Sequence, residues 1–184
     1  MEAGMKLHLT HAAPSRAAVS LDDATLNAAC QLTARIACRV VRQWTDEQYA
    51  DAFGCYRMTA PRVWTDWAAS DVRHLGRLFS YGDAFLIEWR IRRGRPHGST
   101  KGLWAARNAT NEMEVFGPSI QPSTRVPPPW TGPQGFYLCG TVYRAHQRWL
   151  CAVWDRQAKT GTLPVWTGRK APDWYAGLAG EVEP

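Results

Sequence analysis

GDAFLIEWRIRRGRPHGSTKGLWAAR, residues 82–107, joins an alternating apolar segment to a basic loop that glycines punctuate. Over the first part, every second side chain is a large apolar one: Phe85, Ile87, Trp89 and Ile91. A period of two is typical of a half-buried β-strand. We therefore expect a strand over 85–92, with its apolar face in the core and Glu88, Arg90 and Arg92 on an outer face.

The chain that precedes this segment carries helical signals instead. Apolar residues recur at intervals of three and four over 22–44, which is typical of an amphipathic helix. Thr45 and Gln48 have the spacing of a capping box, so a short second helix is expected over 45–54. A similar apolar stripe predicts a third helix over 59–79.

The chain that follows the basic loop is rich in turn residues and in β-branched and aromatic residues. Two antiparallel hairpins and a further strand are expected there, over 103–107 with 112–116, 136–144 with 148–155, and 163–166. The proline-rich segment 117–135 is expected to be an extended connection, because proline interrupts both helices and central strands. A short helix is expected over 172–178.

This order of elements predicts the fold class. Helices that precede a run of strands favour an α+β domain, with the N-terminal helices packed on one face of a mainly antiparallel sheet. Residues 1–20 have no clear period and are expected to be a loose leader. Residues 21–184 are expected to form one domain.

Positive charge is concentrated in segment 82–107. The chain has 184 residues and a net charge of +6, and six of its 22 Lys and Arg residues lie within 82–107, beside only two acidic residues. A local basic patch suits a phosphate backbone or an acidic protein surface. The alternative is a solvated face without a specific ligand.

The cysteine pattern indicates a reducing compartment. The five cysteines include no CxxC pair, and the N-terminal residues contain no apolar segment typical of a signal peptide. No apolar run is long enough to span a bilayer. We therefore expect a cytoplasmic protein without a transmembrane segment.

The basic loop contains the groups that bind phosphate. Glycines allow backbone N–H groups to approach an anion, and hydroxyls and cations complete the shell. The predicted phosphate-binding or nucleic-acid-binding residues are Arg90, Arg92, Arg93, Arg95, Ser99, Thr100 and Lys101. Trp104 is expected to stack on a base. The spacing is not that of a Walker loop, and a basic hairpin loop without a ligand is the alternative.

Two residues of the same segment are candidates for catalysis. Glu88 and Arg90 resemble in spacing the Glu-x-Lys of metal-dependent nucleases, in which the carboxylate holds a divalent metal. His97 has an ordinary pKa near neutrality and is a candidate general acid or base. The alternatives are an ion pair for Glu88 and a surface position for His97. The sequence identifies no further metal ligands, so a divalent metal is expected only if the protein is a nuclease.

Two segments, DEQYADAFGCYRMTAPRVW (46–64) and YGDAFLIEWRIRRG (81–94), resemble the Osa family of plasmid-encoded fertility-inhibition proteins. The resemblance implies a ParB/sulfiredoxin-like fold, nucleotide hydrolysis and DNA cleavage. It also implies inhibition of conjugative DNA transfer at the coupling ATPase. No catalytic residue transfers with it, because the glycine-histidine-arginine phosphate motif of sulfiredoxins cannot be aligned with this chain.

Two functions follow as hypotheses. The first is a mobile-element protein that binds nucleic acid or nucleotide phosphate and inhibits conjugation as a DNase or ATPase. The second is a non-enzymatic inhibitor or adaptor that docks on the coupling ATPase or another acidic protein through a surface rich in Trp and Arg. Exposure of Trp130, Trp166 and Trp174 would favour the second hypothesis.

Overall fold

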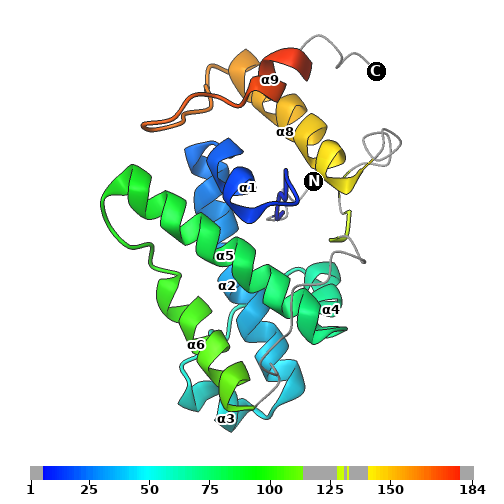
Figure 1. Cartoon of the computed structure of the whole chain (residues 1–184), viewed down its shortest axis with the longest axis vertical. Coiled ribbons are helices and arrows are strands. Elements are labelled where there is room, and N and C mark those ends of the chain that lie inside the picture. The colour runs from blue at the N-terminus through cyan, green and yellow to red at the C-terminus, as the bar shows by residue number, and fades with distance from the viewer. Residues whose placement is uncertain (1–5, 114–127, 131, 133–140, 179–184) are drawn as a thin grey trace.

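The computed structural model describes residues 6–113, 128–130, 132 and 141–178. Throughout these ranges the chain forms helices and no β-strand (Figure 1). The prediction of an α+β domain with an antiparallel sheet is therefore wrong. The helices are α1 (Pro14–Ser20), α2 (Asp23–Trp44), α3 (Glu47–Ala52), α4 (Arg62–Ala69), α5 (Val72–Arg93), α6 (Thr100–Glu112), α8 (Val142–Lys159) and α9 (Asp173–Leu178).

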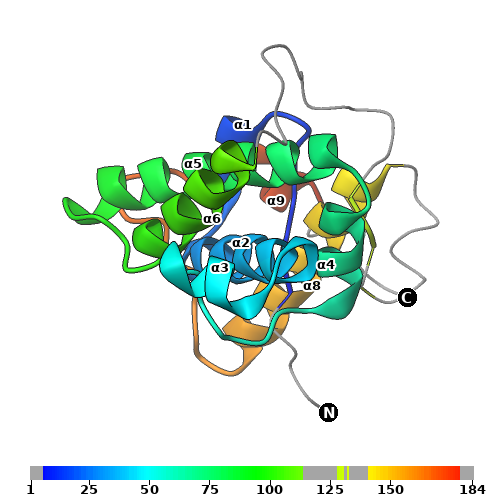
Figure 2. The same cartoon turned by 90° about the horizontal axis from the view of Figure 1, so that it is seen from below.

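Helix α2 is the centre of the packing and confirms the first predicted helix. Asp22 is its N-cap, where the side chain accepts a hydrogen bond from the Thr25 backbone at 3.3 Å. Its buried stripe runs from Leu26 to Val41. Helices α4, α5 and α6 all pack against it, and Figures 1 and 2 show it enclosed by these helices. The predicted period of three and four thus identified the main core helix.

The next two predicted helices differ in detail from the observed ones. Helix α3 begins after Asp46, whose side chain accepts the Tyr49 N–H at 2.7 Å, and the chain turns at Gly54 with φ of 76°. The single helix expected over 59–79 is divided into α4 and α5, because the chain breaks at 70–71. Asp71 then caps α5 by accepting the Arg73 N–H at 2.8 Å.

The predicted strands lie in helices, in an irregular segment or outside the described residues. Segment 85–92 is the C-terminal part of α5, 103–107 lies in α6, and 148–155 lies in α8. Segment 163–166 forms neither helix nor strand. Residues 114–116 and 136–140, with most of the proline-rich connection, lie outside the described residues. The strand predicted at the end of α5 is wrong: Phe85 is buried but Ile87 and Ile91 are exposed, so the alternating apolar residues do not share one buried face.

The segment that begins at Lys6 contacts the C-terminal helix α8. Helices α8 and α9 pack on each other and lie beyond α1, at the opposite end from α3 and α6 (Figure 1). The N-terminal segment places Leu7 and Leu9 in the core. Gln147 of α8 donates to the Thr10 carbonyl at 2.8 Å, and the Trp154 indole donates to Asp22 at 3.1 Å. These hydrogen bonds join the C-terminal helices to the N-terminal part of the domain.

Candidate functional site

The segment 82–107 forms the end of α5, the loop 94–99 and the start of α6, and its candidate residues divide by exposure. Glu88, Arg92, His97 and Ser99 are buried, whereas Arg90, Arg95, Lys101 and Trp104 are exposed. Thr100 is half-buried, and the Arg93 side chain is 41% exposed. The structure therefore separates an internal group of charges from an external basic surface.

Glu88 is held by two arginines. Its Oε1 accepts hydrogen bonds from Arg92 Nε and Arg169 Nε, each at 2.8 Å, and its Oε2 accepts one from Arg169 Nη2 at 2.9 Å. Burial raises the pKa of the Glu88 carboxyl, but the hydrogen bonds from Arg169 and Arg92 outweigh this effect and lower it overall. Glu88 is thus an ionised carboxylate whose oxygens are already occupied by guanidinium groups. The described residues include no group of three potential metal ligands.

Arg92 occupies the centre of the internal group. Besides Glu88, its guanidinium donates to Asp23 Oδ1 at 2.9 Å and to the carbonyls of Leu21 at 2.8 Å and Val19 at 3.0 Å. These partners come from the end of α1 and the start of α2. The side chain therefore joins three helices, and its donors point into the protein.

Asp23 joins the same group to the C-terminal loop. Its carboxylate accepts hydrogen bonds from the Thr167 hydroxyl at 2.6 Å, the Thr167 N–H at 3.2 Å and Arg93 Nη2 at 2.9 Å. Burial raises the pKa of Asp23, but the Thr167 and Arg92 hydrogen bonds lower it overall. Sequence reasoning missed Asp23, Thr167 and Arg169 as partners, because no local pattern connects residues so distant in the chain.

His97 has a structural position under the loop. Its Nε2 lies 2.9 Å from Asn27 Oδ1, and its Nδ1 accepts the Ser99 N–H at 3.0 Å. These contacts assign the proton to Nε2 of a neutral ring, and burial lowers the pKa. Trp89 packs edge-on against the ring, with 4.9 Å between the ring centroids. The Thr100 hydroxyl donates to the His97 carbonyl at 2.7 Å. Both imidazole nitrogens and the Thr100 hydroxyl thus have partners within the protein.

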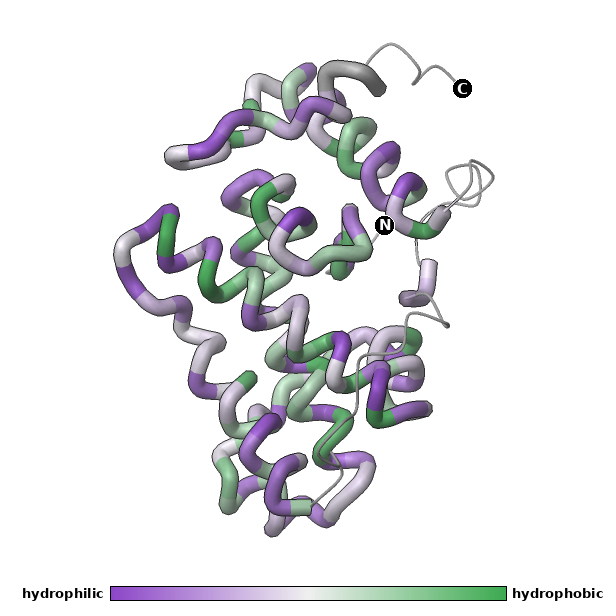
Figure 3. Tube along the Cα trace, viewed as in Figure 1, coloured by the Kyte–Doolittle hydropathy of each residue, from purple (hydrophilic) through white to green (hydrophobic). Residues whose placement is uncertain are grey.

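The external part of the segment is a mixed apolar and basic surface. Two isoleucines one turn apart on α5, Ile87 and Ile91, are 61% and 60% exposed, and Trp104 on α6 is 60% exposed. Exposed cations lie beside them on α5, the loop and α6. We call this surface the α5–α6 face and define it by Ile87, Arg90, Ile91, Arg95, Lys101 and Trp104. Figure 3 shows hydrophobic and hydrophilic residues following one another along the end of α5.

An ion pair connects the two helices of the α5–α6 face. Arg107 Nη2 lies 2.6 Å from Asp83 Oδ2. Asp83 precedes Ile87 by one turn of α5, and Arg107 follows Trp104 by one turn of α6. The pair therefore joins the exposed stripe of α5 to that of α6, and the two helices contact each other. Figures 1 and 2 show α6 following α5 through the loop 94–99. None of the cations that define the face makes an ion pair with a described residue.

A cavity of about 510 Å³ lies beside the end of α5. Trp89 and Arg93 line it from α5, and the guanidinium carbon of Arg93 lies 5.4 Å from the centroid of the Trp89 ring. Leu163, Pro164 and Val165 line it from the C-terminal loop. Arg93 thus forms an ion pair with Asp23 of the internal group and also lines this cavity.

The remaining tryptophans named as interface candidates lie in aromatic clusters. Trp166 and Trp174 pack around Trp154, and Trp130 packs edge-on against Trp149. All three candidates are partly buried, so they do not give the exposed tryptophans that would favour the adaptor hypothesis. Trp104 is the exposed tryptophan of the described residues.

A scan against protein-family models and searches of curated proteins and of solved structures found no match to this chain. Its function must therefore be argued from its own surface. Within the described ranges, no helix has the length and apolar character needed to cross a membrane.

Proposed function

We propose that this is a non-enzymatic binding protein that docks on an acidic protein surface through the α5–α6 face. The observation that carries the proposal is the exposure of Ile87, Ile91 and Trp104 beside cations that have no described ion-pair partner. Large apolar side chains tend to be buried. A group of them that is exposed together on the surface therefore marks a site of contact with a partner.

The residue types favour a protein partner. Trp and Arg contribute most to binding energy at protein interfaces, and a central apolar patch with a polar rim is their usual arrangement. The aliphatic side chains of Ile87 and Ile91 can be desolvated by a protein but cannot stack on bases. Arg90, Arg95 and Lys101 would orient an acidic partner and accelerate its association.

Single-stranded nucleic acid is the second candidate for the same face. Trp104 presents an exposed ring beside Lys101, one turn earlier on α6, and this combination suits base stacking with phosphate contact. Arg92 belongs to the internal network, so phosphate contacts would come from Arg90, Arg95 and Lys101. Ile87 and Ile91 would have no role in this candidate.

The resemblance to the Osa family supplies a specific partner to test. A mobile-element protein that inhibits conjugation from the cytoplasm would meet the coupling ATPase, and we propose this ATPase as the acidic partner. The proposal assigns no chemical step to Glu88 or His97, because their polar atoms already have internal partners. Incubation with DNA and ATP, with Mg²⁺ or with a chelator, tests this directly. Metal-dependent turnover by the purified protein would overturn the non-enzymatic proposal.

Binding assays with two probes separate the candidates. The purified cytosolic domain of a conjugative coupling ATPase and a fluorescent oligothymidine are each titrated with wild-type protein and two variants, I87S/I91S and R90A/R95A/K101A. A protein partner requires that both variants weaken binding to the ATPase. Nucleic acid requires that R90A/R95A/K101A and a third variant, W104A, weaken oligothymidine binding and that I87S/I91S leaves it unchanged. In that case the logarithm of the binding constant of R90A/R95A/K101A is expected to fall less steeply with the logarithm of the salt concentration. The slope decreases in magnitude by about 0.7 for each phosphate that the variant no longer neutralises.

A matched control removes exposed cations elsewhere. Arg39 on α2 and Arg156 on α8 are exposed and make no described ion pair, so R39A/R156A lowers the net charge without altering the α5–α6 face. This control is expected to bind as the wild type does. If it loses as much affinity as R90A/R95A/K101A, the attraction is a general effect of net charge and the proposed face is wrong.

A further inference from the structure

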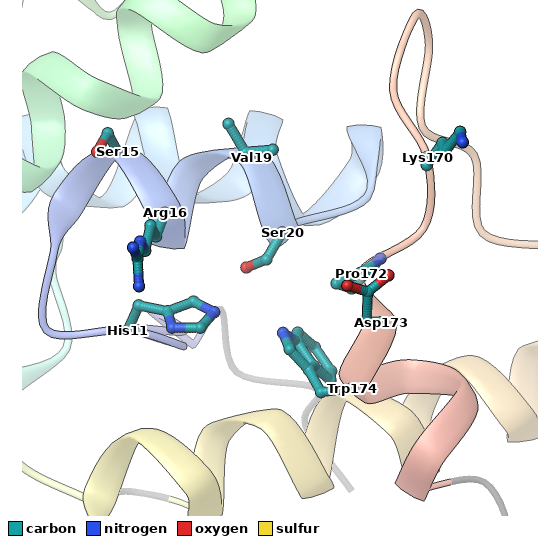
Figure 4. A pocket seen from close by; sticks show the side chains of 9 residues that line it. All are labelled: His11, Ser15, Arg16, Val19, Ser20, Lys170, Pro172, Asp173 and Trp174. Atoms are coloured by element: carbon teal, nitrogen blue, oxygen red, sulfur yellow. The ribbon is translucent and has the colours of Figure 1, made fainter.

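A second cavity, of about 410 Å³, lies between α1 and the C-terminal segment 170–174. Figure 4 shows His11 and Arg16 on one side of it, facing Trp174 on the other. Val19 and Pro172 add apolar surface to its lining. The cavity is within the size range of small-molecule sites, which combine apolar walls with a few polar groups. It is separate from the α5–α6 face and does not depend on the function proposed for that face.

The indole N–H of Trp174 is a donor without an acceptor among the described residues. Its Nε1 is buried and makes no hydrogen bond, although Figure 4 shows it on the edge of the ring directed toward the cavity. Neighbouring indoles of the same aromatic cluster are satisfied. Trp154 donates to Asp22 at 3.1 Å, and Trp166 donates to the Ser20 carbonyl at 3.2 Å. Buried donors are rarely left unpaired, so Trp174 is suited to bind an acceptor that enters the cavity.

The charge of the lining favours an anion. Arg16 and Lys170 both line the cavity, are exposed and make no ion pair with any described residue. Burial lowers the pKa of His11, and the charge of Arg16 lowers it further, so His11 is neutral at pH 7. Asp173 is the acidic residue of the lining. Two cations and one carboxylate leave the lining with a positive charge.

We propose that this cavity binds a small organic anion, either a carboxylate or a phosphate monoester. The anionic head accepts the Trp174 indole N–H and pairs with Arg16. The apolar body lies against Val19, Pro172 and the Trp174 ring. Trp154 stacks on the Trp174 ring at an interplanar angle of 16°. Because Nε1 is covered in this structure, a small movement of the side chains that cover it accompanies binding of the anion.

Proton–nitrogen NMR of the indole groups in the full chain tests the proposal. The Trp174 signal is assigned by its loss in W174F, and the wild type is titrated with benzoate, phenyl phosphate and the neutral analogue benzamide. Benzoate or phenyl phosphate is expected to shift the Trp174 signal in a saturable way, and the stronger of the two identifies the head group. Benzamide is expected to leave the signal in place.

Two variants test whether Arg16 is the cation that binds the anion. R16A is expected to fold, because Arg16 is exposed, and to weaken anion binding about tenfold, which corresponds to about 1.4 kcal/mol. R156A, which removes an exposed cation of α8 away from the cavity, is expected to bind the anion unchanged. The proposal is overturned if neither anion shifts the Trp174 signal, if benzamide shifts it equally, or if R16A binds as tightly as the wild type.

Discussion

Arg92 Nη1 lies 2.9 Å from Asp23 Oδ1, although the two residues are 69 positions apart in the chain. Both side chains are almost completely buried. Glu88, on the same helix as Arg92, supplies a second carboxylate to the guanidinium at 2.8 Å. The contact therefore fixes the start of α2 against the end of α5, and it makes Arg92 the cation that two buried carboxylates share, with Arg93 as a further partner of Asp23 and Arg169 as a further partner of Glu88.

Replacement of Arg92 by alanine is expected to destabilise the protein by about 3–5 kcal/mol, because it leaves Asp23 and Glu88 as buried charges with fewer partners. Urea unfolding followed by tryptophan fluorescence measures this free energy. The matched control is R90A, which removes the exposed arginine two positions earlier and is expected to change stability by less than about 0.5 kcal/mol. Equal stability of the two variants would show that the buried network does not hold the helices together.

A close contact between α6 and the chain after α3 gives a second prediction. A Cβ atom on Gly102 would lie 2.2 Å from Cε2 of Tyr56, and Tyr56 cannot easily move, because its hydroxyl donates to the Gly98 carbonyl and accepts the Gly102 N–H, each at 3.1 Å. G102A is therefore expected to cost about 1–3 kcal/mol in the free energy of unfolding. G98A, where a Cβ meets nothing within 4 Å, is the control and is expected to be nearly neutral. A neutral G102A would mean that Tyr56 has room to shift.

The cysteines give a third prediction, on reactivity. Cys30, Cys38, Cys55 and Cys151 are buried, and burial raises the pKa of Cys30 and of Cys151 to about 12. The Cys55 hydrogen bond lowers the pKa of Cys38, but burial keeps the reagent away from that thiol as well. Labelling by Ellman's reagent at pH 8 is therefore expected to be slow in native protein and fast in urea. The measurement uses C139S, because Cys139 lies outside the described residues. Fast labelling of native C139S would contradict the burial of these thiols.

How much the sequence could predict is clearest in the helices with local signals. The apolar period of α2 and the glycine after α3 are local signals, because each depends only on residues a few positions away. The helix predicted from the period and the helix end predicted at Gly54 are both confirmed. The prediction of a strand at the end of α5 was wrong for a physical reason. There Glu88 and Arg92 are buried while Ile87 and Ile91 are exposed. The alternation over 85–91 therefore combines buried Phe85 with exposed isoleucines, and it does not mark one buried face of a strand.

The candidate sites show the same limit. The basic character of the loop was visible, and Arg90, Arg95, Lys101 and Trp104 do lie on the surface. What could not be inferred is that Arg92 would pair with Asp23, or that Arg169 would cover Glu88, because those pairings depend on tertiary packing. The cavity at Trp174 combines residues from both ends of the chain, and no spacing in the sequence connects them.

The last prediction concerns pH, because His8 and His146 are buried side by side. Their ring centroids are 5.6 Å apart, and neither nitrogen of His146 has a hydrogen-bond partner in the part of the chain that the structure describes. Burial, with a smaller effect of Lys6, lowers the pKa of His8 to about 3. Burial also lowers the pKa of His146 well below its ordinary value, and His8 adds to this effect. Both rings are therefore neutral in the folded protein.

The sign of the effect follows from proton uptake. Below pH 6.5 the unfolded chain binds protons at these histidines and the folded chain does not, so stability is full above that pH and falls as the pH decreases toward the folded pKa. Each histidine is expected to remove about 2 kcal/mol between pH 7 and pH 5. Urea unfolding at both pH values measures the loss for the wild type and for H8L and H146L. Each variant should lose about 2 kcal/mol less than the wild type over this interval, whatever its stability at pH 7. An unchanged pH dependence in both variants would show that these two rings accept protons in the folded state as readily as in the unfolded chain.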